Sequence, residues 1–184
     1  SGNTTISAGA ITVSGLLGNG TYAGGISNAG TLTFSSSSAQ TLSGAISGSG
    51  GITKSGSGNL TLSGSSNFTG AIALSNGTLI AGADNALGSS PTITANNTPT
   101  FKTTNGTTLP SISVTGDVIL ESSVETTGAQ TYNDNVTVKG TGFSLITSNN
   151  NITIGGNLAA YNISGILQLR YNGKYIFNGA SEAT

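Results

Sequence analysis

The chain has 184 residues, of which Gly, Ser, Thr and Asn together supply 103, and only 6% of its residues are charged. An average soluble domain has about 25% charged residues. With five basic residues and a net charge of −1, the sequence lacks the clustered Lys and Arg that nucleic acids and anionic membranes require. No run of about 18 apolar residues occurs, so no part of this segment is expected to insert into a membrane.

Three structural classes compete for this composition. A disordered Gly- and Ser-rich linker is the first, but Ile, Leu, Val and Thr recur throughout and the net charge is small. An ordinary globular domain is the second, but the apolar residues form neither a long run nor a helical stripe. The third is a repetitive β protein, in which short apolar triplets alternate with Gly, Asn and Ser turns. The sequence favours the third class.

From the N-terminus onward, short triplets place two apolar residues around a small one. Successive side chains of a strand point to opposite faces, so the outer residues of each triplet should face inward and the middle one outward. Gly, Asn, Ser and Asp between the triplets are residues that tolerate turn conformations. The clearest triplets are 11–13, 32–34, 60–62, 72–74, 112–114, 136–138 and 152–154.

The step between triplets is about 20 residues, which is typical of a solenoid. The sequence therefore predicts an all-β fold, a right-handed parallel β-helix (β-solenoid) with about 20 residues per coil and roughly 8–9 coils. One coil cannot bury its own triplets, so stacked coils must pair strand on strand. One interior ladder is expected to contain Leu32, Ile52, Ile72, Ile93, Ile112, Val136 and Ile152.

The triplets continue along the chain, so residues 1–184 are expected to form a single β-solenoid segment of a longer protein. Pro99 and Pro110 lie in a Thr- and Asn-rich stretch. Because Pro cannot pair inside a central ladder, 96–110 is expected to be an irregular, exposed coil. Residues 111–184 are more aromatic and charged, and 132–177 is the expected contact region. Neither end carries an evident cap, which favours end-to-end association of copies.

Residues 51–79 carry an ordered series of short motifs. A run from Gly51 to Gly64 reads Gly-Ile-Thr-Lys-Ser-Gly-Ser-Gly-Asn-Leu-Thr-Leu-Ser-Gly, and Phe-Thr-Gly at 68–70 and Gly-Thr-Leu at 77–79 follow it. This order and spacing closely resembles the passenger-associated repeat of bacterial autotransporters. Residues 127–138, Thr-Gly-Ala-Gln-Thr-Tyr-Asn and then Val-Thr-Val, are similar to segments of filamentous-haemagglutinin-like adhesins.

These resemblances imply type V secretion, a parallel β-helical passenger and a place outside the cell or on the bacterial outer surface. They also imply an adhesive role. The expected partner is a glycan or protein of a host surface, another cell or the extracellular matrix. Autotransporter and two-partner secretion stay open as routes.

Among the acidic residues, Asp117 and Glu121 share parity on an expected strand. A carboxylate pair is the minimum for glycoside hydrolysis, and some parallel β-helices cleave polysaccharides. Solvated surface charges are the simpler interpretation, because the chain has no His to act as a tunable base. We therefore expect no enzymatic activity, no cofactor and no metal. Asp84-Asn85 and Asp134-Asn135 are interpreted as turn formers.

Two further surface patterns occur. Thr31/Thr33 and Thr92/Thr94 would suit an ice-binding array only if such pairs recurred in every coil, and in the sequence they are isolated. Asn-x-Ser/Thr sequons are acceptors of N-linked glycans. The candidate glycosylation sites are Asn19, Asn59, Asn67, Asn76, Asn105, Asn135 and Asn151.

Taken together, these patterns predict a non-enzymatic adhesin or structural rod segment that mediates cell–cell or surface attachment. The first alternative is a structural subunit of an extracellular filament, built by end-to-end stacking. The second is a polysaccharide-cleaving β-helix.

Overall fold

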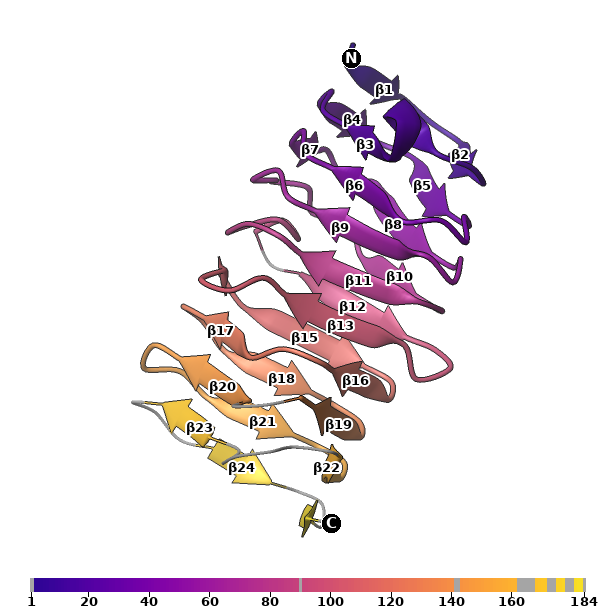
Figure 1. Ribbon diagram of the computed structural model, residues 1–184. Coiled ribbons are helices and arrows are strands. Elements are labelled where there is room, and N and C mark those ends of the chain that lie inside the picture. Colours follow the sequence, from indigo (N-terminus) through magenta and orange to yellow (C-terminus); the bar gives the residue numbers. More distant parts are fainter. Residues whose placement is uncertain are drawn as a thin grey trace.

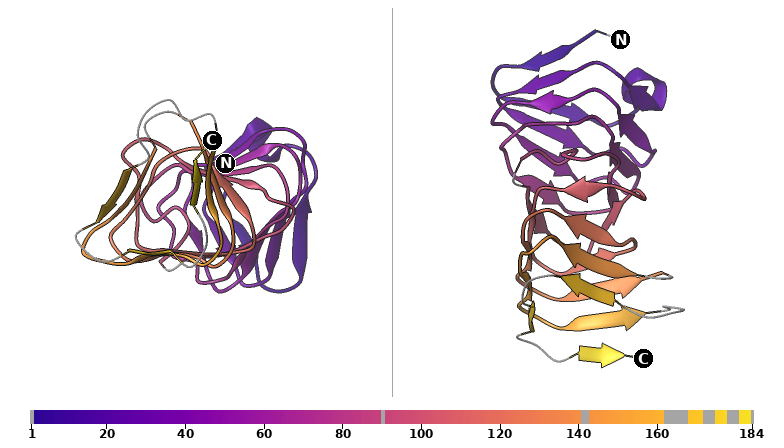
Figure 2. Two further views of the ribbon diagram at one scale, coloured as in Figure 1. Left: turned by 90° about the horizontal axis from the view of Figure 1, so that it is seen from below. Right: turned by 90° about the vertical axis from the view of Figure 1, so that its left-hand side faces the viewer.

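The computed structural model describes residues 2–89, 91–140 and 143–161, together with the backbone of three further strands: β23 (Gln168–Tyr171), β24 (Tyr175–Phe177) and β25 (Ser181–Ala183). The chain winds into a rod with its two ends at opposite ends of the stack (Figures 1 and 2). Every strand pairing in the described residues is parallel. The predicted parallel β-solenoid, of about eight turns with about 20 residues each, is confirmed.

Two nine-stranded sheets run the length of the rod. Sheet B consists of β2 (Ala10–Val13), β5 (Thr31–Phe34), β8 (Gly51–Lys54), β10 (Ile72–Leu74), β12 (Thr92–Ala95), β15 (Ile112–Thr115), β18 (Gln130–Tyr132), β21 (Ile152–Ile154) and β24. Sheet C consists of β3 (Thr21–Tyr22), β6 (Gln40–Leu42), β9 (Asn59–Leu62), β11 (Thr78–Ala81), β13 (Thr100–Thr103), β16 (Val118–Leu120), β19 (Val136–Lys139), β22 (Leu158–Tyr161) and β25.

The third side of the rod carries two shorter sheets, one near each end. Sheet A consists of β1 (Thr4–Ile6), β4 (Ile26–Asn28) and β7 (Ile46–Ser47). Sheet D consists of β14 (Thr108–Leu109), β17 (Val124–Thr126), β20 (Ser144–Thr147) and β23. In each coil that has three strands, the strand of sheet A or sheet D comes first in the chain. A strand of sheet B follows it, and a strand of sheet C comes last. A short 3₁₀ turn, η1 (Leu17–Gly20), joins β2 to β3.

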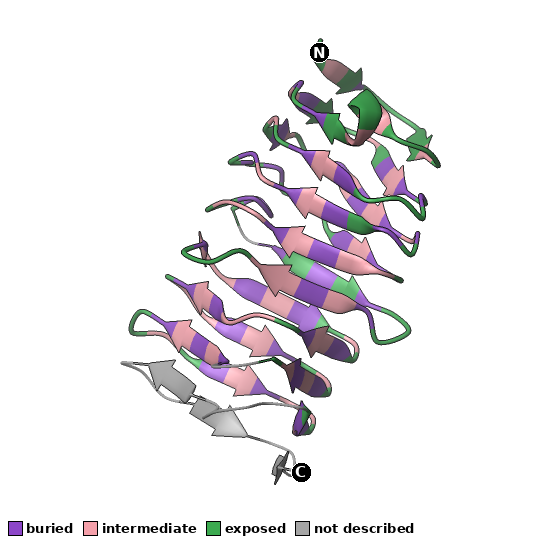
Figure 3. Ribbon diagram, in the orientation of Figure 1, coloured by how far each residue is buried: buried purple, intermediate pink, exposed green. Residues whose placement is uncertain are grey.

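Burial alternates along the strands, so one face of each sheet fills a narrow core (Figure 3). In sheet B, Leu32, Ile52, Ile72 and Ile93 lie in register on successive coils, as expected from their spacing. Their side chains are at most 2% exposed. Such an aliphatic stack is the main source of stability in a fold of this kind, because each coil buries the apolar face of its neighbours.

The later part of the expected ladder needs correction. Ile93 lies beside Val114, and Ile112 lies two residues before Val114 in β15 and pairs with Gln130. Ile152 follows Gln130 in sheet B, but Val136 lies in sheet C. Counting a fixed step of about 20 residues along the sequence led to Val136-Thr137-Val138 in sheet C, because this triplet has the same apolar pattern as the sheet B triplets. The true sheet B segment, Gln130-Thr131-Tyr132, does not have that pattern.

The stretch 96–110 is not the irregular, exposed coil that its prolines suggested. It contains β13 and β14, and the side chains of Phe101 and Leu109 are completely buried. Pro99 comes just before β13, where its missing N–H is not needed, and its carbonyl accepts a hydrogen bond from the Ile119 amide at 3.0 Å. Proline at the start of a strand is compatible with a parallel ladder.

The corner between sheets C and A explains one set of recurring glycines. A Cβ placed on Gly44 would lie 2.1 Å from the carbonyl oxygen of Gly24, and one on Gly64 would lie 2.4 Å from that of Gly44. Real side chains do not approach a backbone oxygen so closely. The corner can therefore be this tight only where each coil supplies a glycine.

Candidate functional site

The structure separates the two acidic residues that the sequence paired. Asp117 lies just before β16, and its Oδ1 accepts hydrogen bonds from the backbone amide (3.1 Å) and side-chain Nδ2 (3.0 Å) of Asn135. Glu121 lies just after β16 and forms an ion pair with Lys102, with 2.9 Å between Nζ and Oε2. The two carboxylates thus stand at opposite ends of one strand, each with its own partner.

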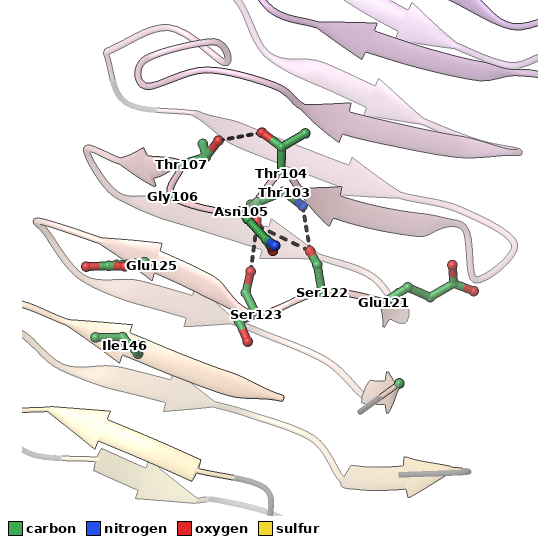
Figure 4. A pocket seen from close by; sticks show the side chains of 11 residues that line it. Thr103, Thr104, Asn105, Gly106, Thr107, Glu121, Ser122, Ser123, Glu125 and Ile146 are labelled. Carbon is green, nitrogen blue, oxygen red and sulfur yellow. Dashed lines mark hydrogen bonds between the residues drawn. The ribbon is translucent and has the colours of Figure 1, made fainter. Parts of the chain in front are cut away.

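Glu121 instead shares a polar hollow with Glu125, at the corner between sheets C and D (Figure 4). The hollow has a volume of about 420 Å³. Its walls come from the loop between β13 and β14 and from the segment between β16 and β17, which belong to successive coils. The lining residues are Thr103, Thr104, Asn105, Gly106, Thr107, Glu121, Ser122, Ser123, Glu125, Gly140 and Ile146.

Hydrogen bonds between the coils fix the walls of this polar hollow (Figure 4). The amide of Thr103 donates to Ser122 Oγ at 2.6 Å, and the hydroxyl of Thr103 donates to the carbonyl of Ser123 at 2.6 Å. Thr104 and Thr107 share a hydrogen bond of 2.8 Å across the loop. The carboxylate of Glu125 makes no hydrogen bond or ion pair to the residues that the structure describes. The hollow is therefore a preformed, hydroxyl-rich recess with a carboxylate free to accept hydrogen bonds.

A second hollow, of about 510 Å³, lies on the outer face of sheet C. The ammonium of Lys139 stands 5.8 Å from the centre of the Tyr161 ring. Tyr161 is 56% exposed, which makes it the most exposed large apolar or aromatic side chain in the described part of the protein. This tyrosine hollow is lined by Thr98, Ile119, Thr137, Lys139, Ala159, Ala160 and Tyr161.

One outward row of side chains joins the two hollows. Phe101 pairs with Leu120, and Leu120 pairs with Val138, so Lys102, Glu121 and Lys139 follow one another on successive coils. Lys139 pairs in turn with Tyr161. Glu121 lines the polar hollow and Lys139 lines the tyrosine hollow, so the two recesses adjoin along this charged row.

The outer face of sheet B is very different. Its residues form a row in register on six successive coils: Thr12, Thr33, Thr53, Ala73, Thr94 and Thr115. The pairs Thr31/Thr33 and Thr92/Thr94 do not recur in every coil, as the sequence predicted, because the other coils supply a single Thr or Ala73 to this row. This face carries hydroxyl and methyl groups and no charge, which sets it apart from the charged row on sheet C.

All seven candidate glycosylation asparagines are exposed. Two of them already make hydrogen bonds: Asn76 Oδ1 accepts from the amide of Gly77 at 2.7 Å, and Asn135 contacts Asp117. Asn105 lies on the rim of the polar hollow. Exposure meets the first requirement for modification, and whether any of the seven carries a glycan stays a prediction.

The described part of the chain contains neither a metal-binding cluster nor a membrane-spanning helix. No three His, Cys, Asp or Glu side chains lie close enough together to hold a metal ion there. No helix there has the length and apolar character needed to cross a membrane. Asp134, interpreted from the sequence as a turn former, accepts a hydrogen bond from the amide of Gly116 at 2.7 Å.

Residues 52–81 match the family model of the Passenger-associated-transport-repeat. The chain carries this passenger-associated transport repeat. The repeat spans β8 to β11, and with it the resemblance drawn from the 51–79 motifs is confirmed. It is typical of autotransporter passengers, so it implies a secreted or surface-exposed location. No curated protein and no solved structure matches the chain.

The structure explains several residues of the repeat. Its lysine, Lys54, is 1% exposed and points into the core, where its ammonium donates to the carbonyls of Gly56 and Asn76, the latter at 3.2 Å. Phe68 of the repeat is buried in the segment between β9 and β10, which forms no strand. Its Gly77 has a φ of +70°, a left-handed conformation that favours glycine. The motif thus encodes one coil and its turns.

Proposed function

We propose that this protein is a non-enzymatic rod segment of a surface-exposed or secreted β-helical passenger that attaches its cell to other cells or surfaces. The observation that carries this proposal is the pair of adjoining hollows on one side of a continuous solenoid that contains the passenger-associated repeat. A stacked β rod extends a surface away from its anchor, and fixed hollows on its side can hold a ligand without prior rearrangement.

The chemistry of the hollows favours binding over catalysis. Hydroxyl groups and a free carboxylate in the polar hollow suit hydrogen bonding to sugar hydroxyls or to a polar protein surface. Glu121 is held by Lys102, and Asp117 is held by Asn135 at the other end of β16. With no His in the sequence, neither hollow has a base of the usual tunable kind.

Attachment is tested with the purified chain coupled to beads, which are then incubated with cells and with immobilised glycans and matrix proteins. We expect the beads to be retained on at least one surface. The double variant Glu121→Gln/Glu125→Gln should lower retention by about tenfold, because each change removes a charge-assisted hydrogen bond. The matched control Thr33→Ala/Thr94→Ala, on the uncharged face of sheet B, should behave as the wild type.

Three outcomes contradict the proposal: retention on no surface, equal losses in both double variants, or release of reducing ends from a polysaccharide panel. The last result, if it disappeared in Glu121→Gln, would establish the polysaccharide-cleaving alternative.

A specific observation also favours the filament subunit as a second candidate. The first coil leaves Ile11 40% exposed and Leu16 49% exposed, and β2 pairs on one edge only, with β5. Ile11 continues the aliphatic stack of Leu32 and Ile52. A second copy could therefore extend both the ladder and the core. Electron microscopy of the concentrated chain should then show rods of several molecular lengths, and single short rods throughout would exclude this candidate.

A further inference from the structure

We propose that the tyrosine hollow binds a carboxylate-bearing saccharide, with Lys139 pairing the carboxylate and the Tyr161 ring lying against an apolar face of the sugar. The proposal rests on the attachment function and names the ligand class for one of its two hollows. It stands on three observations: a cation that forms no ion pair with the described residues, an exposed ring beside it, and a lining that alternates apolar and hydroxyl groups.

The charge of the hollow is set by Lys139. Its ammonium forms no ion pair with any residue that the structure describes, and it is the one charged side chain in the described lining. The charges of the neighbouring Lys102 and Glu121 neutralise each other, because Lys102 Nζ lies 2.9 Å from Glu121 Oε2. A ligand carboxylate at Lys139 therefore gains a charge-assisted hydrogen bond without displacing a protein carboxylate from the described lining.

The ring of Tyr161 supplies the second contact. Tyr22 and Tyr132 are buried, so Tyr161 is the one exposed aromatic ring among the described residues. An exposed tyrosine offers an apolar body and a polar tip, and it loses little conformational entropy on binding. A pyranose has C–H faces and a hydroxyl rim, so it complements a ring of this kind.

The other lining residues also provide both apolar surface and hydroxyl groups. Ile119, Ala159 and Ala160 provide small apolar surface, and the hydroxyls of Thr98 and Thr137 can donate or accept hydrogen bonds. No hydrogen bond within the described residues occupies either hydroxyl. A nucleic acid is a poorer fit, because a single ammonium cannot neutralise a run of phosphates. An acidic peptide shares the carboxylate but lacks the hydroxyl rim, and the test below separates it.

The full chain is titrated calorimetrically with two acidic saccharides, an oligomer of galacturonic acid and a sialylated lactose, and with their neutral counterparts, cellotetraose and lactose. We expect at least one acidic saccharide to bind and its neutral counterpart to bind about tenfold more weakly or not at all. Lys139→Gln and Tyr161→Leu should each weaken binding of the acidic saccharide by about tenfold. Thr61→Gln, on the same outer face of sheet C but four coils from Lys139, should leave binding unchanged.

All three side chains lie on the outside of sheet C, so each variant should keep the solenoid fold. Circular dichroism of each variant checks this. Equal binding of acidic and neutral saccharides, or wild-type binding by Lys139→Gln, overturns the proposal. Tight binding of a tetra-aspartate peptide without saccharide binding also overturns it, in favour of a protein ligand. Beads that still attach to cells while Lys139→Gln and Tyr161→Leu have no effect would refute this ligand and leave the attachment function standing.

Discussion

Tyr132 donates a hydrogen bond to Gln130 Oε1 at 3.1 Å inside the solenoid, where both side chains are at most 1% exposed. Gln130 in turn donates from Nε2 to the carbonyls of Val124 at 2.9 Å and Ile146 at 2.8 Å. These carbonyls belong to β17 and β20, so one amide links sheet B to sheet D across the core. Buried polar groups in such a network depend on one another for satisfaction.

Replacing Gln130 with Leu should destabilise the protein by about 3 kcal/mol, since it removes two hydrogen bonds to core-facing carbonyls and leaves the buried Tyr132 hydroxyl without its acceptor. Urea denaturation measures this loss. Thr131→Ala, on the outer face of the same strand, is the matched control and should change the free energy of unfolding by no more than about 0.5 kcal/mol. Equal effects of the two changes would show that the Gln130 network contributes nothing specific.

The pH dependence of stability should report Tyr132. Burial raises the pKa of its hydroxyl well above the ordinary value of 10.0. A raised pKa in the folded state means that the unfolded chain loses this proton first, so the contribution of Tyr132 is complete below pH 10 and decreases at higher pH. The wild type should therefore lose stability above pH 10 relative to Tyr132→Phe. Parallel pH curves for the two proteins would contradict the buried position of the hydroxyl.

Lys54 should act in the opposite direction. Burial lowers the pKa of its ammonium below 10.5, although two backbone carbonyls accept its hydrogen bonds. Between the lowered folded-state pKa and 10.5, the unfolded chain binds more protons than the folded one, so stability rises with pH in that window. Lys54→Met removes this rise, and the difference between the two proteins should shift in favour of the wild type as pH increases toward 10.5. The control is Thr53→Met, on the outer face of the same strand, which removes no titrating group, so its difference in stability from the wild type should not change with pH.

The glycine corner gives a steric prediction. Gly44→Ala would place a Cβ 2.1 Å from the carbonyl oxygen of Gly24. Relief of this clash requires the backbone of two coils to move apart, so we expect a loss of about 3 kcal/mol in thermal or urea unfolding. Gly15→Ala meets no atom within 4 Å and should be nearly neutral. A neutral Gly44→Ala would mean that the coils are less tightly stacked at this corner.

Much of the fold could be predicted because its information is local. An apolar residue on each side of a small one specifies a buried strand face, and a regular step specifies stacking, so Leu32, Ile52, Ile72 and Ile93 could be aligned by inspection. The alignment was displaced by two residues at Ile112 and then missed β18, where Tyr132 takes a core position and donates a hydrogen bond to Gln130. A tyrosine in the sequence is equally compatible with an exposed position, as Tyr161 shows.

The hollows could not be predicted in the same way. Each is formed by segments of successive coils, and the lateral position of one coil on the next depends on turn conformations that differ from coil to coil. Glu121 and Glu125 lie on either side of a short bend, so counting along one strand paired Glu121 with Asp117 instead. The signal that was available is the hydroxyl-rich run at 103–108, followed about one coil later by Glu-Ser-Ser at 121–123.

The exposed end of the aliphatic stack leads to a prediction about association. Ile11 is 40% exposed, whereas Leu32, its partner in the next coil, is 2% exposed. If copies stack end to end, Ile11 is buried at the contact, and analytical ultracentrifugation of the chain should show self-association that increases with concentration. Ile11→Lys should weaken this association by about tenfold or more, because burial of an unpaired ammonium is costly. Thr12→Lys adds the same charge one residue away, on the outer face of β2, and should leave the association intact. A monomer at every concentration, or equal effects of the two lysines, would exclude stacking through the Ile11 ladder.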